Sequence, residues 1–204
     1  MSSVKVPATR MKADERRELV LEAASRVFGE RGYVGATTDA VARAAGVSQP
    51  YIVRMFGTKE SLFLAVLHRA LDRLMTAFRA VLAGHGPAHP SGATDIHSLL
   101  GAAYADLLAD RGILLSLMQG FILGSDPVIG VHARAGFLAV YRLLREDAGF
   151  SPEEARDFFA AGMLLNTLVG IRMSADYDTD PAAREFLETA LPTKVGFLLS
   201  LEGD

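Results

Sequence analysis

Apolar residues recur along the chain at intervals of three and four, the spacing of one face of an α-helix. No run of Val, Ile or Thr alternates with polar residues, so the pattern predicts no strand. Helices are expected at about 13–31, 38–45, 49–55, 59–83, 94–110, 112–124, 127–148, 152–175 and 181–201. The predicted fold class is therefore all-α, with about nine helices.

Several of these helices have recognisable ends. On the first, the buried face is predicted to comprise Leu19, Ala23, Val27 and Phe28. Gly32 is expected to end that helix. Three later helices start at an acceptor side chain followed by proline: Asp126-Pro127, Ser151-Pro152 and Asp180-Pro181.

The clearest interruption is GHGPAHPSG at residues 84–92, where three glycines and two prolines prevent a continuous helix. Together with the helical pattern of residues 37–62, the composition of the chain suggests three regions. These are a basic arm at 1–12, a small helical domain at 13–58 and a larger helical domain at 59–204.

Residues 37–62, TTDAVARAAGVSQPYIVRMFGTKESL, have the pattern of a helix-turn-helix. Ala42 is small enough for two helices to cross closely, and Gly46 can adopt the positive φ of the turn between them. Ser48 is the expected N-cap of the second helix. At 100° per residue, Ile52 and Phe56 should face inward on that helix.

The opposite side of the second helix, Pro50, Tyr51 and Arg54, is then free to face outward. The motif resembles the DNA-binding domain of the TetR family of transcriptional regulators. The positions that carry the resemblance are Thr37, Thr38, Ala42, Ala45, Gly46, Val47, Ser48, Phe56, Lys59 and Leu62. Val53 and Met55 depart from the family pattern, which usually has an aromatic residue at the first position and His or Tyr at the second.

The resemblance implies a second helix that enters the major groove, with its first residues at the base edges. Gln49 is expected to pair with adenine, and Arg54 with guanine or a phosphate. The hydroxyls of Thr38 and Ser48 and the ammonium of Lys59 are expected at phosphates. Arg10 and Lys12 belong to the basic arm, which is expected to reach phosphate or the minor groove.

One such helix reads only a few base pairs, so a homodimer on a pseudo-palindromic double-stranded operator is expected. The last two helices carry abundant apolar surface and resemble the family's dimer interface. The expected interface residues are Phe158, Phe159, Gly162, Leu165, Phe186, Leu187, Ala190, Leu191, Phe197 and Leu198.

The resemblance further implies a pocket for a small hydrophobic effector among the middle helices. The expected lining residues are Tyr104, Leu108, Met118, Phe121, Phe137, Tyr141, Met163 and Asn166. Taken singly, each of these residues fits a role in the core better than a role at a ligand. Asn166 is the most informative of them because it interrupts an apolar run, where an unpaired polar group would cost about 1–3 kcal/mol. A contact with a partner helix would explain Asn166 equally well.

Charge changes this picture only when it is divided by position. The net charge is −3, yet residues 1–60 contain ten Lys and Arg against seven Asp and Glu. A basic amino-terminal end is compatible with DNA binding. The chain has no cysteine, which excludes disulfides and cysteine-ligated metals.

No catalytic constellation, cofactor or metal site is predicted. His85 and His89 have the spacing of a metal pair but lie in the Gly/Pro segment. The longest apolar run, residues 112–124, is shorter than the roughly 20 residues of a membrane span, so a cytoplasmic protein is expected. The most favoured function is a transcriptional repressor that is released by its ligand. The alternative is an all-helical carrier or enzyme for a hydrophobic molecule, without DNA binding.

Overall fold

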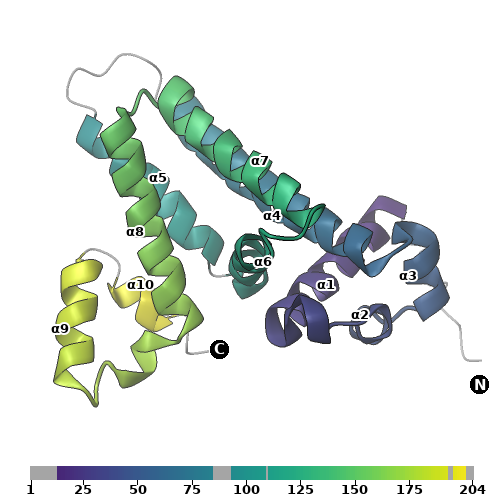
Figure 1. Cartoon of the computed structure of the whole chain (residues 1–204). Coiled ribbons are helices and arrows are strands. Elements are labelled where there is room, and N and C mark those ends of the chain that lie inside the picture. Colours follow the sequence, from purple (N-terminus) through teal and green to yellow (C-terminus); the bar gives the residue numbers. More distant parts are fainter. Residues whose placement is uncertain (1–12, 85–92, 109, 193–194, 201–204) are drawn as a thin grey trace, which may run out of the picture. The chain divides into compact units, whose positions relative to one another are not determined.

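The computed structural model describes residues 13–84, 93–108, 110–192 and 195–200, with only the backbone at 93–95 and 197. Every regular element in these residues is helical, which confirms the all-α prediction (Figure 1). They form two compact units, Met1–Val66 and Leu67–Asp204. The division falls inside one helix, eight residues after the boundary expected from the sequence.

The first unit contains α1 (Ala13–Gly35), α2 (Thr38–Ala44), α3 (Gln49–Phe56) and the first two turns of α4 (Lys59–Gly84). The backbone of α1 leaves the helical conformation at Gly32, where φ is +66°, as the sequence predicts. Ala23, Val27 and Phe28 are buried as predicted, whereas the fourth predicted residue, Leu19, is not. Val20 is fully buried and Leu19 is 46% exposed, so the expectation for Leu19 was wrong. Val20, Ala24, Val27 and Phe28 share the helical spacing that packs inward.

The turn between α2 and α3 forms as predicted. Gly46 has a φ of +64°, and the amide of Val47 donates to the carbonyl oxygen of Ala42 at 3.0 Å. This is the hydrogen bond of a Schellman motif, which ends a helix through a left-handed residue. Ala42 is only 2% exposed at the contact between the two helices. Local sequence therefore sets the direction in which α3 leaves the turn.

The second unit contains the remainder of α4 with α5 (Ala93–Leu108), α6 (Arg111–Ile122), α7 (Ile129–Arg142), α8 (Pro152–Gly170), α9 (Pro181–Ala190) and α10 (Val195–Ser200). Figure 1 shows α7 running along α4. Their contact is close because Gly136 of α7 has no side chain to collide with Leu71 of α4. Leu74 and Phe78 of α4 continue it, packing in one core with Val140.

A second core in this unit joins α5, α6 and α8 to the last two helices. It contains Leu108, Leu114 and Leu168, all at most 1% exposed. Leu187 of α9 and Leu198 of α10 complete it. The carboxyl-terminal segment is thus folded against its own chain.

Three predicted helices differ from the observed ones. The helix expected at 127–148 begins at Ile129, because Asp126 accepts from the amides of both Val128 and Ile129, and it ends in a π-helical turn at Leu143–Asp147. The helix expected at 152–175 ends at Gly170, and left-handed Arg172 (φ 55°) leads into a 3-10 turn at Met173–Asp176. The start of that helix, with a capping box between Ser151 and Glu154, agrees with the prediction.

The single helix expected at 181–201 was also wrong. It is divided into α9 and α10, and Leu191 already has a non-helical backbone. Leu191 precedes Pro192, and a residue before proline is disfavoured in the helical conformation. No helix in the described ranges combines the length and apolarity needed to cross a bilayer.

Candidate nucleic-acid interface and ligand pocket

Helix α3 has one buried face and one exposed face. Ile52 is fully buried and anchors the helix, whereas Pro50, Val53 and Arg54 are exposed. Gln49 is half-buried at the first position of the helix. A short helix that is held at its inner side and presents polar groups at its start has the form that enters a DNA major groove.

The amide of Gln49 is oriented by a neighbouring helix. Its Nε2 donates to the hydroxyl oxygen of Thr38, the first residue of α2, at 3.3 Å. Ser48 has the extended backbone of an N-cap, but its hydroxyl makes no capping hydrogen bond to α3. By contrast, the Thr37 hydroxyl accepts from Ala40 and caps α2. Thr38, Ser48 and Gln49 therefore gather at the adjoining starts of α2 and α3.

Tyr51 lies between two guanidinium groups. The centre of its ring is 5.2 Å from Arg54 on the same helix and 5.8 Å from Arg16 on α1. Arg17 lies 4.7 Å from the ring of Phe56. Each distance is within the range of a cation–π contact. The aromatic rings of α3 thus bring two α1 arginines to this part of the unit.

Sequence analysis did not assign Arg16 and Arg17 to the interface. The signal that could have found them is their distance from the buried stripe of α1 together with the two aromatic residues on the facing helix. Arg10 and Lys12 lie outside the described residues.

Lys59 has structural contacts that the sequence did not indicate. Its ammonium donates to the carbonyl oxygens of Tyr33 at 3.0 Å and Val34 at 3.4 Å, and it lies 4.7 Å from the centre of the Tyr33 ring. An ammonium has three N–H donors, so one remains for another acceptor. Lys59 therefore fixes the end of α1 to the start of α4, and its role at phosphate stays a prediction.

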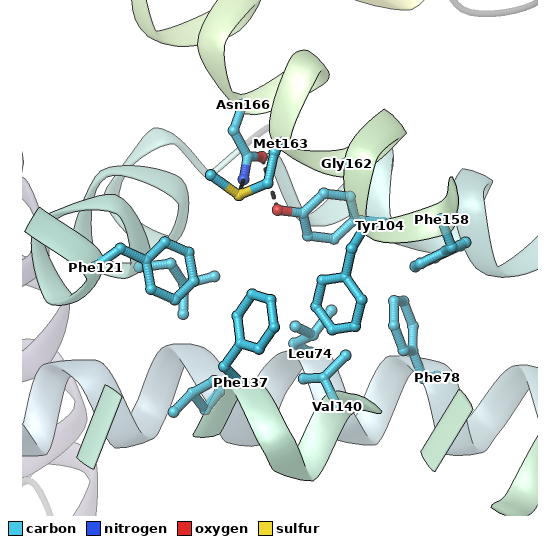
Figure 2. A pocket seen from close by; sticks show the side chains of 13 residues that line it. Leu74, Phe78, Tyr104, Phe121, Phe137, Val140, Phe158, Gly162, Met163 and Asn166 are labelled. Atoms are coloured by element: carbon cyan, nitrogen blue, oxygen red, sulfur yellow. Dashed lines mark hydrogen bonds between the residues drawn. The ribbon is translucent and has the colours of Figure 1, made fainter. Parts of the chain in front are cut away.

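The second unit contains a largely apolar pocket, partly open to solvent, with a cavity volume of about 50 Å³. Residues from five helices, α4 to α8, line it (Figure 2). They are Leu71, Leu74, Phe78, Tyr104, Leu117, Phe121, Phe137, Val140, Phe158, Phe159, Gly162, Met163 and Asn166. An apolar pocket with a few convergent polar groups has the chemical character of a small-molecule site.

The polar groups of the cavity meet at one point. The hydroxyl of Tyr104 donates to Oδ1 of Asn166 at 2.7 Å, joining α5 to α8. Burial raises the pKa of Tyr104 to about 12, against a smaller opposing effect of that hydrogen bond. The phenol is therefore neutral at physiological pH. Figure 2 shows the two side chains pointing toward each other at one side of the cavity.

The cavity brings together some of the predicted ligand residues. Tyr104, Phe121, Phe137, Met163 and Asn166 line it. The other three predicted ligand residues pack elsewhere: Leu108 is fully buried in the core of α5, α6 and α8, Met118 packs against that core, and Tyr141 packs against the core that α4 forms with α7. Those three positions have a structural role in the described fold.

The residues predicted for the dimer interface are found in three settings. Phe158, Phe159 and Gly162 line the cavity. Four leucines are buried in the protomer's own core, and Ala190 packs against them: Leu165, Leu187, Leu191 and Leu198. Phe186 is 45% exposed, and the side chain of Phe197 lies outside the described residues. Helical periodicity identified these positions as apolar but could not say which surface each would cover.

Metal ligands do not cluster in the described ranges, where no group of three or more His, Cys, Asp or Glu could hold an ion. His68 and His132 form a pair, with Nε2 and Nδ1 3.1 Å apart. Burial and the neighbouring His132 lower the pKa of His68. His85 and His89 lie outside the described residues.

Comparison with known proteins gives a consistent result. A family model described as "Bacterial regulatory proteins, tetR family" matches residues 20–66. The chain is 47% identical over 164 residues to the HTH-type transcriptional activator FasR of Mycolicibacterium smegmatis, covering 76% of this chain and 70% of that protein. It is 42% identical over 67 residues to the HTH-type transcriptional repressor AcnR of Corynebacterium efficiens, covering 33% of this chain and 36% of that protein.

A solved structure extends the similarity over both units. The multidrug binding protein EbrR, complexed with imidazole, is 27% identical with a TM-score of 0.54, covering 93% of this chain and 98% of its own.

Proposed function

Because the chain belongs to the TetR family of bacterial transcriptional regulators, we propose that it recognises its operator through the exposed face of α3 and that a small hydrophobic ligand in the cavity controls this binding. The observation that carries the DNA-binding part is the division of α3 into a face buried at Ile52 and an opposite face exposed at Pro50 and Arg54. The family match makes the chain a DNA-binding regulator.

Gln49 is the proposed reader of adenine, because its amide can pair bidentately with the base edge and is already oriented by Thr38. Arg54 is the proposed contact to guanine or phosphate. The Tyr51 ring restrains the Arg54 guanidinium. Thr38, Ser48 and Lys59 are proposed at phosphates, which fix the position of the protein without specifying sequence.

Regulators of this family act as dimers, and a two-fold dimer suits a pseudo-palindromic operator. We propose that the interface uses α8 together with the exposed Phe186 of α9. Leu165, Leu187, Leu191 and Leu198 are buried in the protomer's own core, so they would hold these helices in place without contacting the partner.

The ligand would act through α4. This helix supplies Leu71, Leu74 and Phe78 to the cavity, and its first residues belong to the DNA-binding unit. A ligand that moves α4 would change the spacing of the two recognition helices of a dimer. The similarity to EbrR, which is described as a multidrug binding protein, supports a hydrophobic effector.

The direction of control has two candidates. The short match to the repressor AcnR covers a third of this chain, whereas the match to the activator FasR covers three quarters. Repression by operator occupancy is the simpler mechanism, and the longer match favours activation as the second candidate. Run-off transcription from a promoter that carries the bound sequence separates them. Repression lowers the transcript and activation raises it, and an unchanged transcript would contradict the proposed function.

Lys59→Met is expected to weaken operator binding and to reduce its salt dependence. Each phosphate contact contributes about one unit to the slope of log Kd against log salt, so a dimer should lose about two units. Fluorescence anisotropy across a salt series measures this slope. Deleting residues 1–12, with Arg10 and Lys12, should reduce it in the same way.

Arg142→Met is the matched control, since Arg142 is an exposed cation on α7, outside the proposed DNA and dimer surfaces. An unchanged slope with lower stability of Lys59→Met would mean that Lys59 only fastens α1 to α4.

A further inference from the structure

The cavity of the second unit is uncharged. Among its described lining residues there is no Asp, Glu, Lys, Arg or His. Tyr104 is the titratable group that lines it, and burial keeps that phenol neutral. An ionised ligand would lose its hydration on entry without meeting an opposite charge, which is strongly unfavourable. The chemistry of the wall therefore disfavours carboxylates, and it offers no carboxylate to pair with an ammonium ion.

The wall is also unusually aromatic. Phe137 of α7 and Phe159 of α8 are stacked, with ring centres 4.3 Å apart and planes 21° apart. Phe121 of α6 meets Phe137 edge to face at 5.9 Å. At the other end, Phe78 and Phe158 meet at 5.8 Å and 77°. Rings in these arrangements favour a flat, unsaturated ligand that can stack or meet them edge on.

One hydrogen-bond donor in the cavity lacks a strong acceptor. Oδ1 of Asn166 is occupied by the Tyr104 hydroxyl, so the Asn166 amide is held with Nδ2 directed elsewhere. Nδ2 has the thioether sulfur of Met163 at 3.9 Å as its acceptor. A thioether is a weak acceptor, and Asn166 is only 2% exposed. A ligand oxygen that replaced the sulfur would give this buried donor a better partner.

We propose that the cavity selects an uncharged, flat aromatic molecule with one hydrogen-bond acceptor, such as a ketone oxygen. Asn166 Nδ2 donates a hydrogen bond to that acceptor. This inference rests on the proposed control by a ligand. The Tyr104 hydroxyl is a positioning group, because it fixes the orientation of the amide. Figure 2 shows the polar pair at one side of the cavity and the phenylalanine rings around the rest. The selectivity thus comes from one polar contact within an aromatic surround.

Three naphthalenes of nearly equal shape test this proposal by isothermal titration calorimetry. They are 2-acetylnaphthalene, which has a ketone, 2-isopropenylnaphthalene, which has no oxygen, and 2-naphthoate, which is charged. We expect the ketone to bind the full-length protein about tenfold more tightly than the hydrocarbon, the ratio of one net hydrogen bond. The naphthoate should bind more weakly than either.

Two variants connect this ratio to the amide. Asn166→Leu should reduce the preference for ketone over hydrocarbon to about one. Tyr104→Phe frees Oδ1 of Asn166, so 1-(2-naphthyl)ethanol should gain affinity relative to the ketone. Circular dichroism establishes that each variant is folded. If Asn166→Leu fails to fold, the wild-type comparison and Tyr104→Phe still decide the matter.

Each outcome has a separate meaning. Equal binding of ketone and hydrocarbon, or tightest binding of the naphthoate, would overturn the proposed ligand class and leave a ligand-binding cavity in place. Binding of none of the three would overturn both the ligand class and the proposed control by a ligand. Operator binding, measured separately by anisotropy, would stand in either case.

Discussion

Replacing Gln49 and Arg54 together with alanine is expected to abolish sequence-specific operator binding while the fold persists. A bidentate side chain–base pair contributes about 1–3 kcal/mol of discrimination, and a dimer makes each contact twice. The double substitution should therefore reduce specific affinity by at least about a hundredfold. Both side chains lie on the outer part of α3, and Ile52, which holds the helix in place, is unchanged.

Competition anisotropy with specific and random duplexes measures this effect. Arg142→Ala is the control, because it removes an exposed cation from α7, outside the proposed DNA and dimer surfaces, and should leave specificity intact. Unchanged discrimination by the double variant would contradict the role assigned to α3. Circular dichroism and binding of 2-acetylnaphthalene show whether the variant keeps its fold and cavity.

Phe28→Ala is expected to unfold the DNA-binding unit selectively. Phe28 is fully buried, and its ring meets Phe63 edge to face at 5.0 Å and stacks with Tyr33 at 6.2 Å. Truncation of a buried phenylalanine costs about 3–5 kcal/mol, a large fraction of the stability of a small domain. Operator binding should be lost, because Lys59 also joins this cluster through Tyr33.

Hydrogen exchange can follow the two units separately. Amides of α1 to α3 should lose protection in Phe28→Ala, whereas amides of α5 to α8 should keep theirs. Leu19→Ala is the control, since Leu19 lies on the same helix but is 46% exposed, and it should change stability little. Equal loss of protection in both variants, or throughout the chain, would contradict the assignment of Phe28 to a separate core.

The helix-turn-helix could be predicted because its determinants are local. Gly46 supplies the left-handed turn and Ala42 the close crossing, and neither depends on distant residues. The same is true of the capping box at Ser151 and of the Asp180 cap. Leu19 shows the limit of this reasoning. It is exposed and its neighbour Val20 is buried, so an error of one residue in locating the buried face of a helix is enough to misassign a position.

The carboxyl-terminal half was harder to predict because its helices are apolar on more than one side. Phe158 and Phe159 of α8 face the cavity, whereas Leu165, one to two turns further along, is buried in the core with α9 and α10. A sequence pattern identifies all three as apolar and cannot assign each to a partner. Pro192 was the one local signal that was overlooked, and it accounts for the division between α9 and α10.

The contacts of Arg16, Arg17 and Lys59 were missed for a different reason. Each depends on the approach of two helices that are separated in sequence, and long cationic side chains leave no periodic signal. They matter for function, since they connect α1 to the aromatic residues of α3 and to the start of α4.

Selection of bound duplexes from a random pool tests the central claim most directly. If two copies of α3 read adjacent major grooves, the enriched sequences will be two-fold symmetric, with half-sites centred about one helical turn apart or a small multiple of that spacing. Enrichment of no sequence, or of a single half-site without symmetry, would contradict the account.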